Sequence, residues 1–115
     1  MLEWFPLLGA FLTLALGTLG LVAPRKIAGL VGIVPDGKLG LSEVRATYGG
    51  IFIGLGAGCL FFQQSEVYVA VGLAWLFAAA ARTASIFLDR AFSIKNAGGI
   101  IVEAGIGLLL VASVL

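Results

Sequence analysis

Two residues of opposite charge lie within long apolar segments, and they are the strongest candidates for chemistry in this sequence. Arg82 lies seven residues before Asp89, and Glu103 lies seven residues after Asn96. At 1.5 Å per residue, each charge is about 10 Å inside the end of its helix. A charged group in hydrocarbon is costly, so its presence indicates a function or a specific partner. We therefore predict that Arg82 and Glu103 face each other at equal depth.

Other polar residues share helical faces with this pair. Residues three, four or seven apart lie on one side of a helix, and three such polar stripes occur in three different apolar segments. The sequence therefore predicts a buried polar cluster or ligand site at the following positions: Arg45, Tyr48, Arg82, Ser85, Asp89, Asn96 and Glu103.

Three interpretations of this cluster remain open. It is a salt-bridge cluster that fixes helix register, or a cavity that holds the polar head of a ligand, or a proton or ion pathway through Glu103. In the second case Trp75, Phe52 and Tyr48 line an apolar region above the head. A pathway is poorly supported, because the last ten residues of the chain, 106–115, contain Ser113 as their only polar residue.

A separate stripe consists of Gly50, Gly54 and Gly58. It forms two overlapping GxxxG units, the pattern of a glycine zipper, which lets two helix backbones approach closely in lipid. We expect these glycines to pack against another helix of the same chain, with a contact to a second subunit as the alternative.

Several kinds of chemistry have no support in the sequence. It has one cysteine, Cys59, and no histidine, which removes disulfides, CxxC motifs, the commonest metal ligand and the commonest general base. No basic tract for nucleic acid occurs. We therefore expect no metal, no cofactor, no nucleic-acid partner and, on balance, no enzymatic activity.

The composition indicates which kind of secondary structure holds these residues. The hydrophobic fraction is 61% and the charged fraction is 11%, whereas soluble domains carry about 25% charged residues. A helix needs roughly 20 apolar residues to cross a bilayer, and four segments are long enough: about 2–23, 42–64, 67–88 and 96–115. We predict one all-α domain over residues 1–115, a bundle of four transmembrane helices. Glu3 replaces the positive start of a signal peptide, so we expect the first helix to be retained.

The connection between the first two helices is the only long one. It contains Pro24 and the turn sequence Pro35-Asp36-Gly37. Apolar residues at helical spacing predict a short helix over Pro24–Val34 in the membrane interface, with an irregular loop as the alternative. Ser42 is the predicted N-cap of the second transmembrane helix.

The basic residues predict the orientation in the membrane. With four spans, all seven fall on one side: Arg25, Lys26, Lys38, Arg45, Arg82, Arg90 and Lys95. Basic residues accumulate on the cytoplasmic side of membrane proteins. We therefore predict a multi-pass protein of the bacterial inner membrane, with both termini in the periplasm.

The stretch from Ser42 to Gly50, read with Ile51 to Gly56, resembles the hallmark of the DUF4345 family. These are small four-helix bacterial membrane proteins of uncharacterised function. The resemblance covers nearly the whole chain and implies that five residues matter to the family: Glu43, Arg45, Tyr48, Arg82 and Asp89. A weaker similarity to DoxX-like proteins implies a link to quinone-linked sulfur oxidation, for which this chain lacks cysteines and cofactor motifs.

Our leading functional hypothesis is binding of a lipid or apolar small molecule in a polar-headed site within the bundle. An accessory or scaffold role beside a partner membrane protein, or in a homo-oligomer, belongs to the same hypothesis. The first alternative is a small transporter or channel subunit that uses Glu103, and the second is a quinone-linked membrane enzyme.

Overall fold

The computed structural model describes residues 3–115, and in that range the chain is helical with no strand. The elements are α1 (Trp4–Val22), α2 (Pro24–Val31), α3 (Gly37–Val44), a π-helical segment (Arg45–Ile51), α4 (Phe52–Phe62), α5 (Ser65–Leu88), α6 (Ile94–Val111) and a final 3₁₀ turn (Ala112–Val114). Four helices are long and apolar enough to cross a membrane, because α3, the π-helical segment and α4 form one continuous helix. The predicted fold class, an all-α membrane protein with four spanning helices, is confirmed.

The short helix after α1 exists, but it ends at Val31 rather than Val34. Pro24 begins it, because proline fits the first helical position and forces the preceding residue out of the helical region. Gly32 ends it in the left-handed conformation, with φ of 79°. The Ile33 amide then donates to the Ala28 carbonyl at 2.8 Å, which completes the helix end.

The second spanning helix starts at Gly37, so Ser42 lies inside α3 and is not its N-cap. The predicted turn at Pro35-Asp36-Gly37 leads directly into the helix, since the Gly40 amide donates to the Asp36 carbonyl at 3.0 Å. The helix therefore begins earlier than the apolar pattern indicates.

The last two spanning helices also begin earlier than predicted. Gln63 adopts the left-handed conformation, with φ of 50°, so the chain reverses within two residues and α5 begins at Ser65. Ser93 caps α6, because its hydroxyl accepts from the Asn96 amide at 3.0 Å. An N-cap at Ser93 places Ile94 and not Asn96 at the start of the helix.

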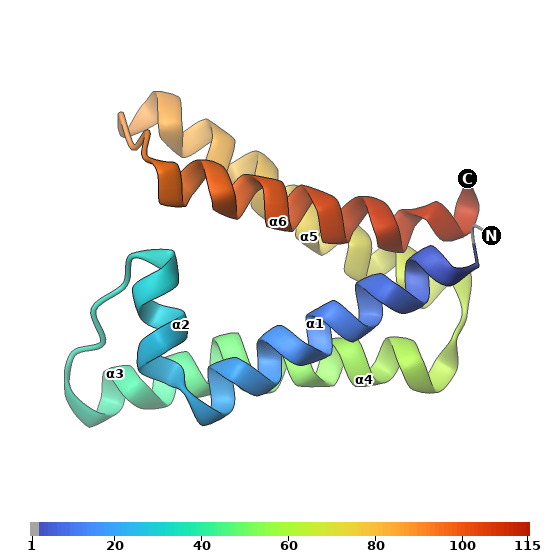
Figure 1. Cartoon of the computed structure of the whole chain (residues 1–115), viewed down its shortest axis with the longest axis horizontal. Coiled ribbons are helices and arrows are strands. Elements are labelled where there is room, and N and C mark those ends of the chain that lie inside the picture. The colour runs from blue at the N-terminus through green and yellow to red at the C-terminus, as the bar shows by residue number, and fades with distance from the viewer. Residues whose placement is uncertain (1–2) are drawn as a thin grey trace.

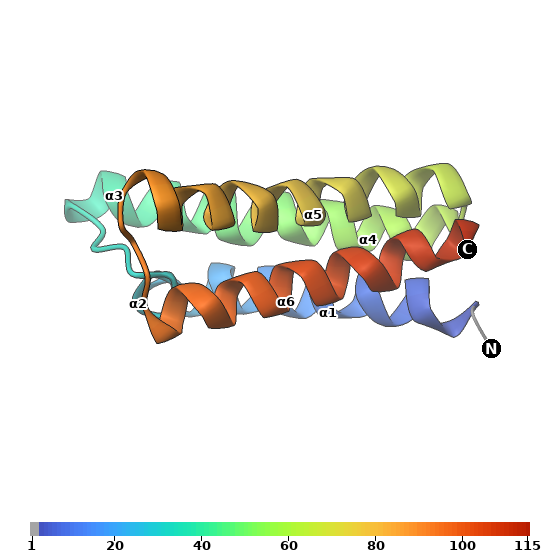
Figure 2. The ribbon, with the colours of Figure 1, turned by 90° about the horizontal axis from the view of Figure 1, so that it is seen from above.

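The helices form two arms. In the first arm α1 packs along α4 and the π-helical segment, and in the second α5 packs along α6. The arms meet beside the two termini and diverge toward the end that carries α2, α3 and the α5–α6 turn (Figure 1). Seen from above, α5 lies over α4 and α6 lies over α1 (Figure 2). Because α4 and α5 contact each other little, the arms are joined mainly through α1 and α6.

Glycines allow close contact within each arm. A Cβ on Gly20 of α1 would overlap the Tyr48 carbonyl oxygen, and one on Gly56 of α4 would lie 2.6 Å from the Leu14 nitrogen. In the second arm, a Cβ on Gly72 would lie 3.0 Å from the Gly107 carbonyl. These backbones approach as closely as small-residue packing in membranes allows.

The predicted packing of Gly50, Gly54 and Gly58 within the chain is wrong. A Cβ on Gly54 or Gly58 would meet no atom within 4 Å, and one on Gly50 would meet only the Arg45 carbonyl at 3.9 Å. Gly56 contacts α1 instead, so the Gly50, Gly54 and Gly58 face of the helix turns away from the bundle.

A buried polar contact holds the arms together where they meet. The Trp75 indole donates to the Thr13 hydroxyl at 3.0 Å, and Thr13 donates to the Gly9 carbonyl at 2.8 Å. Thr13 is fully buried, and the surrounding core contains Cys59 and Leu110. We call this region the joint. It fixes the arms at one end and leaves the other end open.

Candidate functional site

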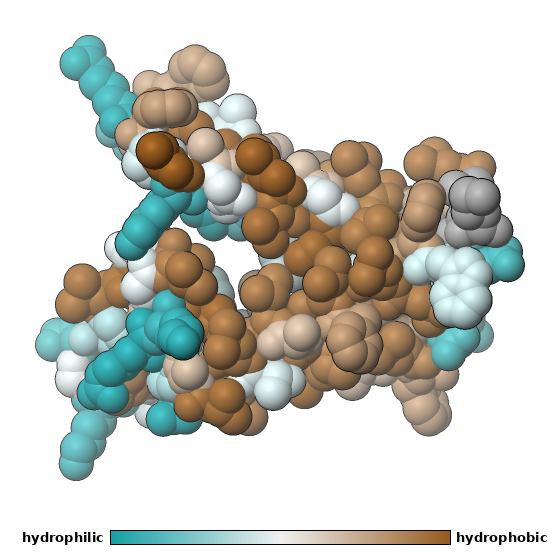
Figure 3. All heavy atoms as spheres, in the orientation of Figure 1, coloured by the Kyte–Doolittle hydropathy of each residue, from teal (hydrophilic) through white to brown (hydrophobic). Residues whose placement is uncertain are grey.

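The space between the diverging arms is a cleft with two openings. A cavity of about 520 Å³ opens between α4 and α5, and one of about 360 Å³ opens between α2 and α6. Both are lined by the same five side chains: Tyr48, Phe52, Trp75, Arg82 and Glu103. They are therefore two sides of one cleft, and Figure 3 shows the molecule hollowed between its arms.

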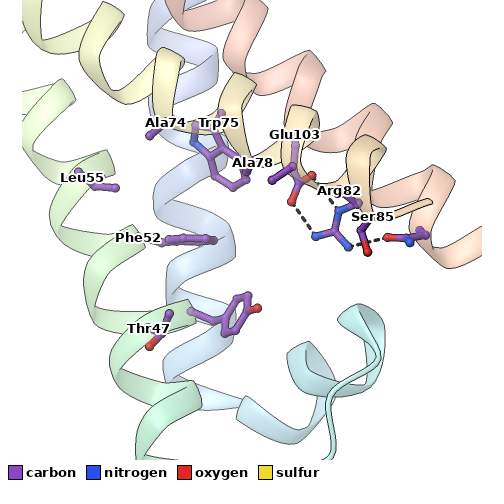
Figure 4. Close-up of a pocket in the computed structure, with 12 residues that line it drawn as sticks. Thr47, Phe52, Leu55, Ala74, Trp75, Ala78, Arg82, Ser85 and Glu103 are labelled. Carbon is purple, nitrogen blue, oxygen red and sulfur yellow. Dashed lines mark hydrogen bonds and ion pairs between the residues drawn. The ribbon is translucent and has the colours of Figure 1, made fainter. Parts of the chain in front are cut away.

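Arg82 and Glu103 face each other on one wall of this cleft, as the sequence predicted. The Arg82 Nε donates to Glu103 Oε1 at 2.9 Å, and Nη2 donates to Oε2 at 2.7 Å. The ion pair is thus bidentate, and the side chains of Arg82 and Glu103 are 24% and 12% exposed. Figure 4 shows the pair on the second arm, with Phe52 and Leu55 on the helix across the cleft.

Asn96 completes this group. Its Oδ1 accepts from Arg82 Nη1 at 3.0 Å, while its Nδ2 donates to the Ala91 carbonyl at 2.7 Å. Gly99 leaves room for the arginine, since a Cβ there would lie 2.9 Å from Arg82 Nε. The α5–α6 contact therefore positions the guanidinium from three directions.

The Arg82 guanidinium retains hydrogen-bonding capacity. A guanidinium carries five N–H donors, and the bonds to Glu103 and Asn96 use three of them. Within residues 3–115, the remaining two have no protein partner. Because Arg82 lines both openings, these donors are available to a molecule in the cleft.

Ser85 and Asp89 form a separate contact. The Ser85 hydroxyl donates to Asp89 Oδ2 at 2.7 Å. Ser85 lines the cleft, but Asp89 is exposed at the end of α5 and bonds neither Arg82 nor Glu103. The prediction that Asp89 joins the buried cluster is wrong, because it lies one helical turn beyond Ser85 and outside the last turn of α5.

Arg45 does not join the cluster either. It is exposed, and its Nη1 donates to the Leu21 carbonyl near the end of α1. The last carbonyls of a helix have no partner within it, and a cation there is favourable. Arg45 therefore caps α1 and does not face Arg82.

Aromatic side chains line the first-arm wall of the cleft, with Tyr48 and Phe52, and its closed end, with Trp75 of α5. The rings of Tyr48 and Phe52 lie 5.9 Å apart in an edge-to-face arrangement, and those of Phe52 and Trp75 lie 5.0 Å apart. This line leads from the π-helical segment to the joint. π-Helical turns occur often at functional sites, and here one carries Tyr48. Small residues of α5, Ala74 and Ala78, leave the space in front of these rings open.

Lys95 is a cleft residue that the sequence did not reveal. It lines the opening between α2 and α6, where its Nζ donates to the Gly29 carbonyl at 2.9 Å. The sequence presents it as one more basic residue at a helix end. Its position next to Asn96 is the only signal that it faces inward.

The described part of the chain holds no group of three or more His, Cys, Asp or Glu side chains that could bind a metal ion. What the site offers is a paired charge, spare N–H donors and an aromatic wall. This arrangement suits binding by hydrogen bonds and apolar contact.

Comparison with known proteins places the chain in a family. No curated protein and no solved structure matched it. The similarity to DoxX-like proteins is not supported by any match and stays a prediction. The DUF4345 pattern matches residues 1–114, essentially the whole chain. The resemblance carried by the Ser42–Gly50 stretch is thereby confirmed, and the protein belongs to the DUF4345 family, a domain of unknown function.

Proposed function

We propose that this protein binds a membrane lipid or another apolar small molecule in the cleft between its arms. This proposal rests on one observation: polar side chains gather at one depth in the cleft, and apolar side chains surround them. Arg82, Glu103 and Asn96 lie on the second arm, Phe52 faces them from the first arm, and Trp75 of α5 lies at the closed end of the cleft beside the joint. Ligand sites are typically apolar cavities of about 300–1,000 Å³ with a few polar groups that fix orientation.

The pairing of Arg82 with Glu103 supports binding over catalysis. The ion pair is bidentate, so most of the charge of each side chain is compensated where water is scarce. The sequence has no histidine, and the Ser85 hydroxyl donates to the exposed Asp89 at the end of α5 and does not bond the ion pair. The spare N–H donors of Arg82 suit a carbonyl, ester or phosphate oxygen of a ligand.

The site also depends on how the protein sits in the membrane. Four apolar helices are consistent with a multi-pass membrane protein. We propose that it lies in the bacterial inner membrane with the open end of the cleft at the cytoplasmic face and both termini in the periplasm. All seven basic residues favour this orientation. Leu30, Val34, Leu39, Phe92 and Ile94 are exposed at the tips of the arms and suit the headgroup boundary.

A second candidate is an accessory role in which the protein contacts another membrane protein or a second copy of itself. The exposed face of Gly50, Gly54 and Gly58 favours it, since it has no partner within the described chain. Transport through Glu103 is less well supported. The cleft ends at the joint, where Thr13 is fully buried and bonded to Trp75.

Filling the cleft tests the proposal. Ala78 faces the cavity (Figure 4), and Ala78→Phe is expected to occupy the space in front of the aromatic wall. Native mass spectrometry should show a lipid retained by the wild type and lost from Ala78→Phe. Ala80→Phe is the matched control, because Ala80 lies on the exposed side of α5.

A second readout reports on the cleft directly. In a Trp4→Phe background Trp75 is the only tryptophan. Lipids brominated on their acyl chains should quench its fluorescence in the wild-type cleft and quench it less in Ala78→Phe. Equal lipid retention and equal quenching in the two phenylalanine variants would show that the cleft is not the binding site.

A further inference from the structure

Charge is distributed unevenly along the molecule. The end where the arms diverge carries all seven basic side chains and four acidic ones, Asp36, Glu43, Asp89 and Glu103, for a net charge of +3. The joint end carries Glu3 and Glu66 and no basic side chain. An anionic group is therefore attracted to the open end of the cleft and not to the joint.

Within the cleft itself the net charge comes from one residue. The charged side chains that line the two openings are Arg82, Glu103 and Lys95. Since Arg82 and Glu103 neutralise each other, Lys95 supplies the net charge of +1. Lys38 and Arg90 lie at the same end of the molecule but line neither opening.

The Lys95 side chain spans the opening between α2 and α6. Its bond to the Gly29 carbonyl links the first turn of α6 to α2. An ammonium group has three N–H donors, and this bond uses one of them. The ammonium therefore sits at the entrance with two donors available, whereas a lysine that only marks membrane orientation extends away toward the lipid headgroups.

The polar groups lie at two levels. Lys95 is at the start of α6, and the Arg82 guanidinium lies deeper, between its bonds to Asn96 and Glu103. The Glu103 carboxylate disfavours a second anion at the deeper level, but the spare Arg82 donors suit a neutral acceptor. Beyond both levels the lining is apolar as far as Trp75.

We infer that the cleft takes an acidic glycerolipid, with its anionic head at Lys95, its ester carbonyls at Arg82 and an acyl chain directed toward Trp75. The inference rests on the proposed function and adds the ligand class. The order of groups from the entrance inward, charge, then hydrogen-bond acceptor, then hydrocarbon, is the order in such a lipid.

The test compares two lipids with identical acyl chains in nanodiscs, phosphatidylglycerol and phosphatidylcholine, by native mass spectrometry of the retained lipid. One basic residue near a lipid surface contributes about a fivefold preference for the acidic lipid. We expect this preference in the wild type, its loss in Lys95→Gln and its retention in Lys95→Arg. Lys38→Gln removes the same charge outside the cleft and should leave the preference unchanged.

The outcomes separate the two proposals. Equal retention of both lipids by the wild type, or the same loss of preference in Lys38→Gln as in Lys95→Gln, overturns the acidic-lipid inference and leaves lipid binding intact. Retention of no lipid, with no quenching of Trp75, overturns both. Displacement of the retained lipid by millimolar inorganic phosphate would show that Lys95 binds a free anion, against the inference, whereas retention supports it.

Discussion

The joint and the open end of the cleft use polar groups in opposite ways. At the joint, Thr13 is fully buried and both its hydrogen bonds stay within the protein. At the open end, Arg82 and Lys95 are also bonded, but each retains donors that no described residue uses. Buried polar groups are normally satisfied. The Thr13–Trp75 contact is thus satisfied within the protein, whereas the open end keeps hydrogen-bond donors that the proposed ligand would use.

Removing the acid of the ion pair should have the largest effect. Glu103→Gln leaves the partly buried Arg82 charge without a counterion, which costs about 3–5 kcal/mol when one partner of a buried pair is lost. Unfolding followed by circular dichroism in a denaturing detergent series measures the loss. Glu43→Gln is the control, because Glu43 is exposed on α3. A stability of Glu103→Gln equal to the wild type would mean that water already screens the pair and would weaken the contrast with the joint.

Separating the helices of the first arm should have the next largest effect. A Cβ at Gly20 would clash with the backbone at Tyr48, so Gly20→Ala should cost about 1–3 kcal/mol through overpacking. The same unfolding assay applies. Gly54→Ala is the matched control, since a Cβ there meets nothing within 4 Å, and alanine raises helix propensity by about 1 kcal/mol. If Gly54→Ala lost as much stability as Gly20→Ala, the exposed face of Gly50, Gly54 and Gly58 would have to contact a second protein molecule.

Removing the polar contact at the joint should have the smallest effect of the three. Thr13→Val deprives the Trp75 indole of its acceptor, and hydrogen bonds within membrane proteins contribute about 0.6–2 kcal/mol. Thr18→Val should be nearly neutral, because Thr18 is exposed and bonds only the Leu14 carbonyl of its own helix. Comparing the two by unfolding isolates the joint. A larger loss in Thr18→Val than in Thr13→Val contradicts the assignment of the joint as the structural end.

Sequence reasoning succeeded where regular helix geometry decides the outcome. The equal depth of Arg82 and Glu103 follows from rise per residue and a short connection, and the two side chains do meet. It failed where helices end or depart from α geometry. Asp89 lies at the end of α5 and bonds Ser85 of its own helix, whereas Arg45 begins the π-helical segment and bonds the Leu21 carbonyl of α1.

The glycine prediction failed because this helix carries glycines on two faces. Gly49 and Gly56, seven residues apart and so on one side of the helix, pack on α1, whereas a Cβ on Gly54 or Gly58 meets no atom within 4 Å. Spacing alone does not say which of the two faces meets a neighbouring helix. The divergence of the arms, and with it the inward position of Lys95, depends on how the joint packs. No local pattern in the sequence encodes that.

The second arm packs on the first at the joint, and at the entrance the Lys95–Gly29 hydrogen bond links it to α2. About 20 Å of α5 separates Trp75 from Leu88, at 1.5 Å per residue, so a rotation of roughly 10° about the joint moves the tip by about 3 Å. Such a rotation would change the width of the entrance and break the Lys95–Gly29 bond while the Trp75–Thr13 contact stays closed. A ligand wider than the present cleft would therefore require pivoting at the joint, with no helix unfolded.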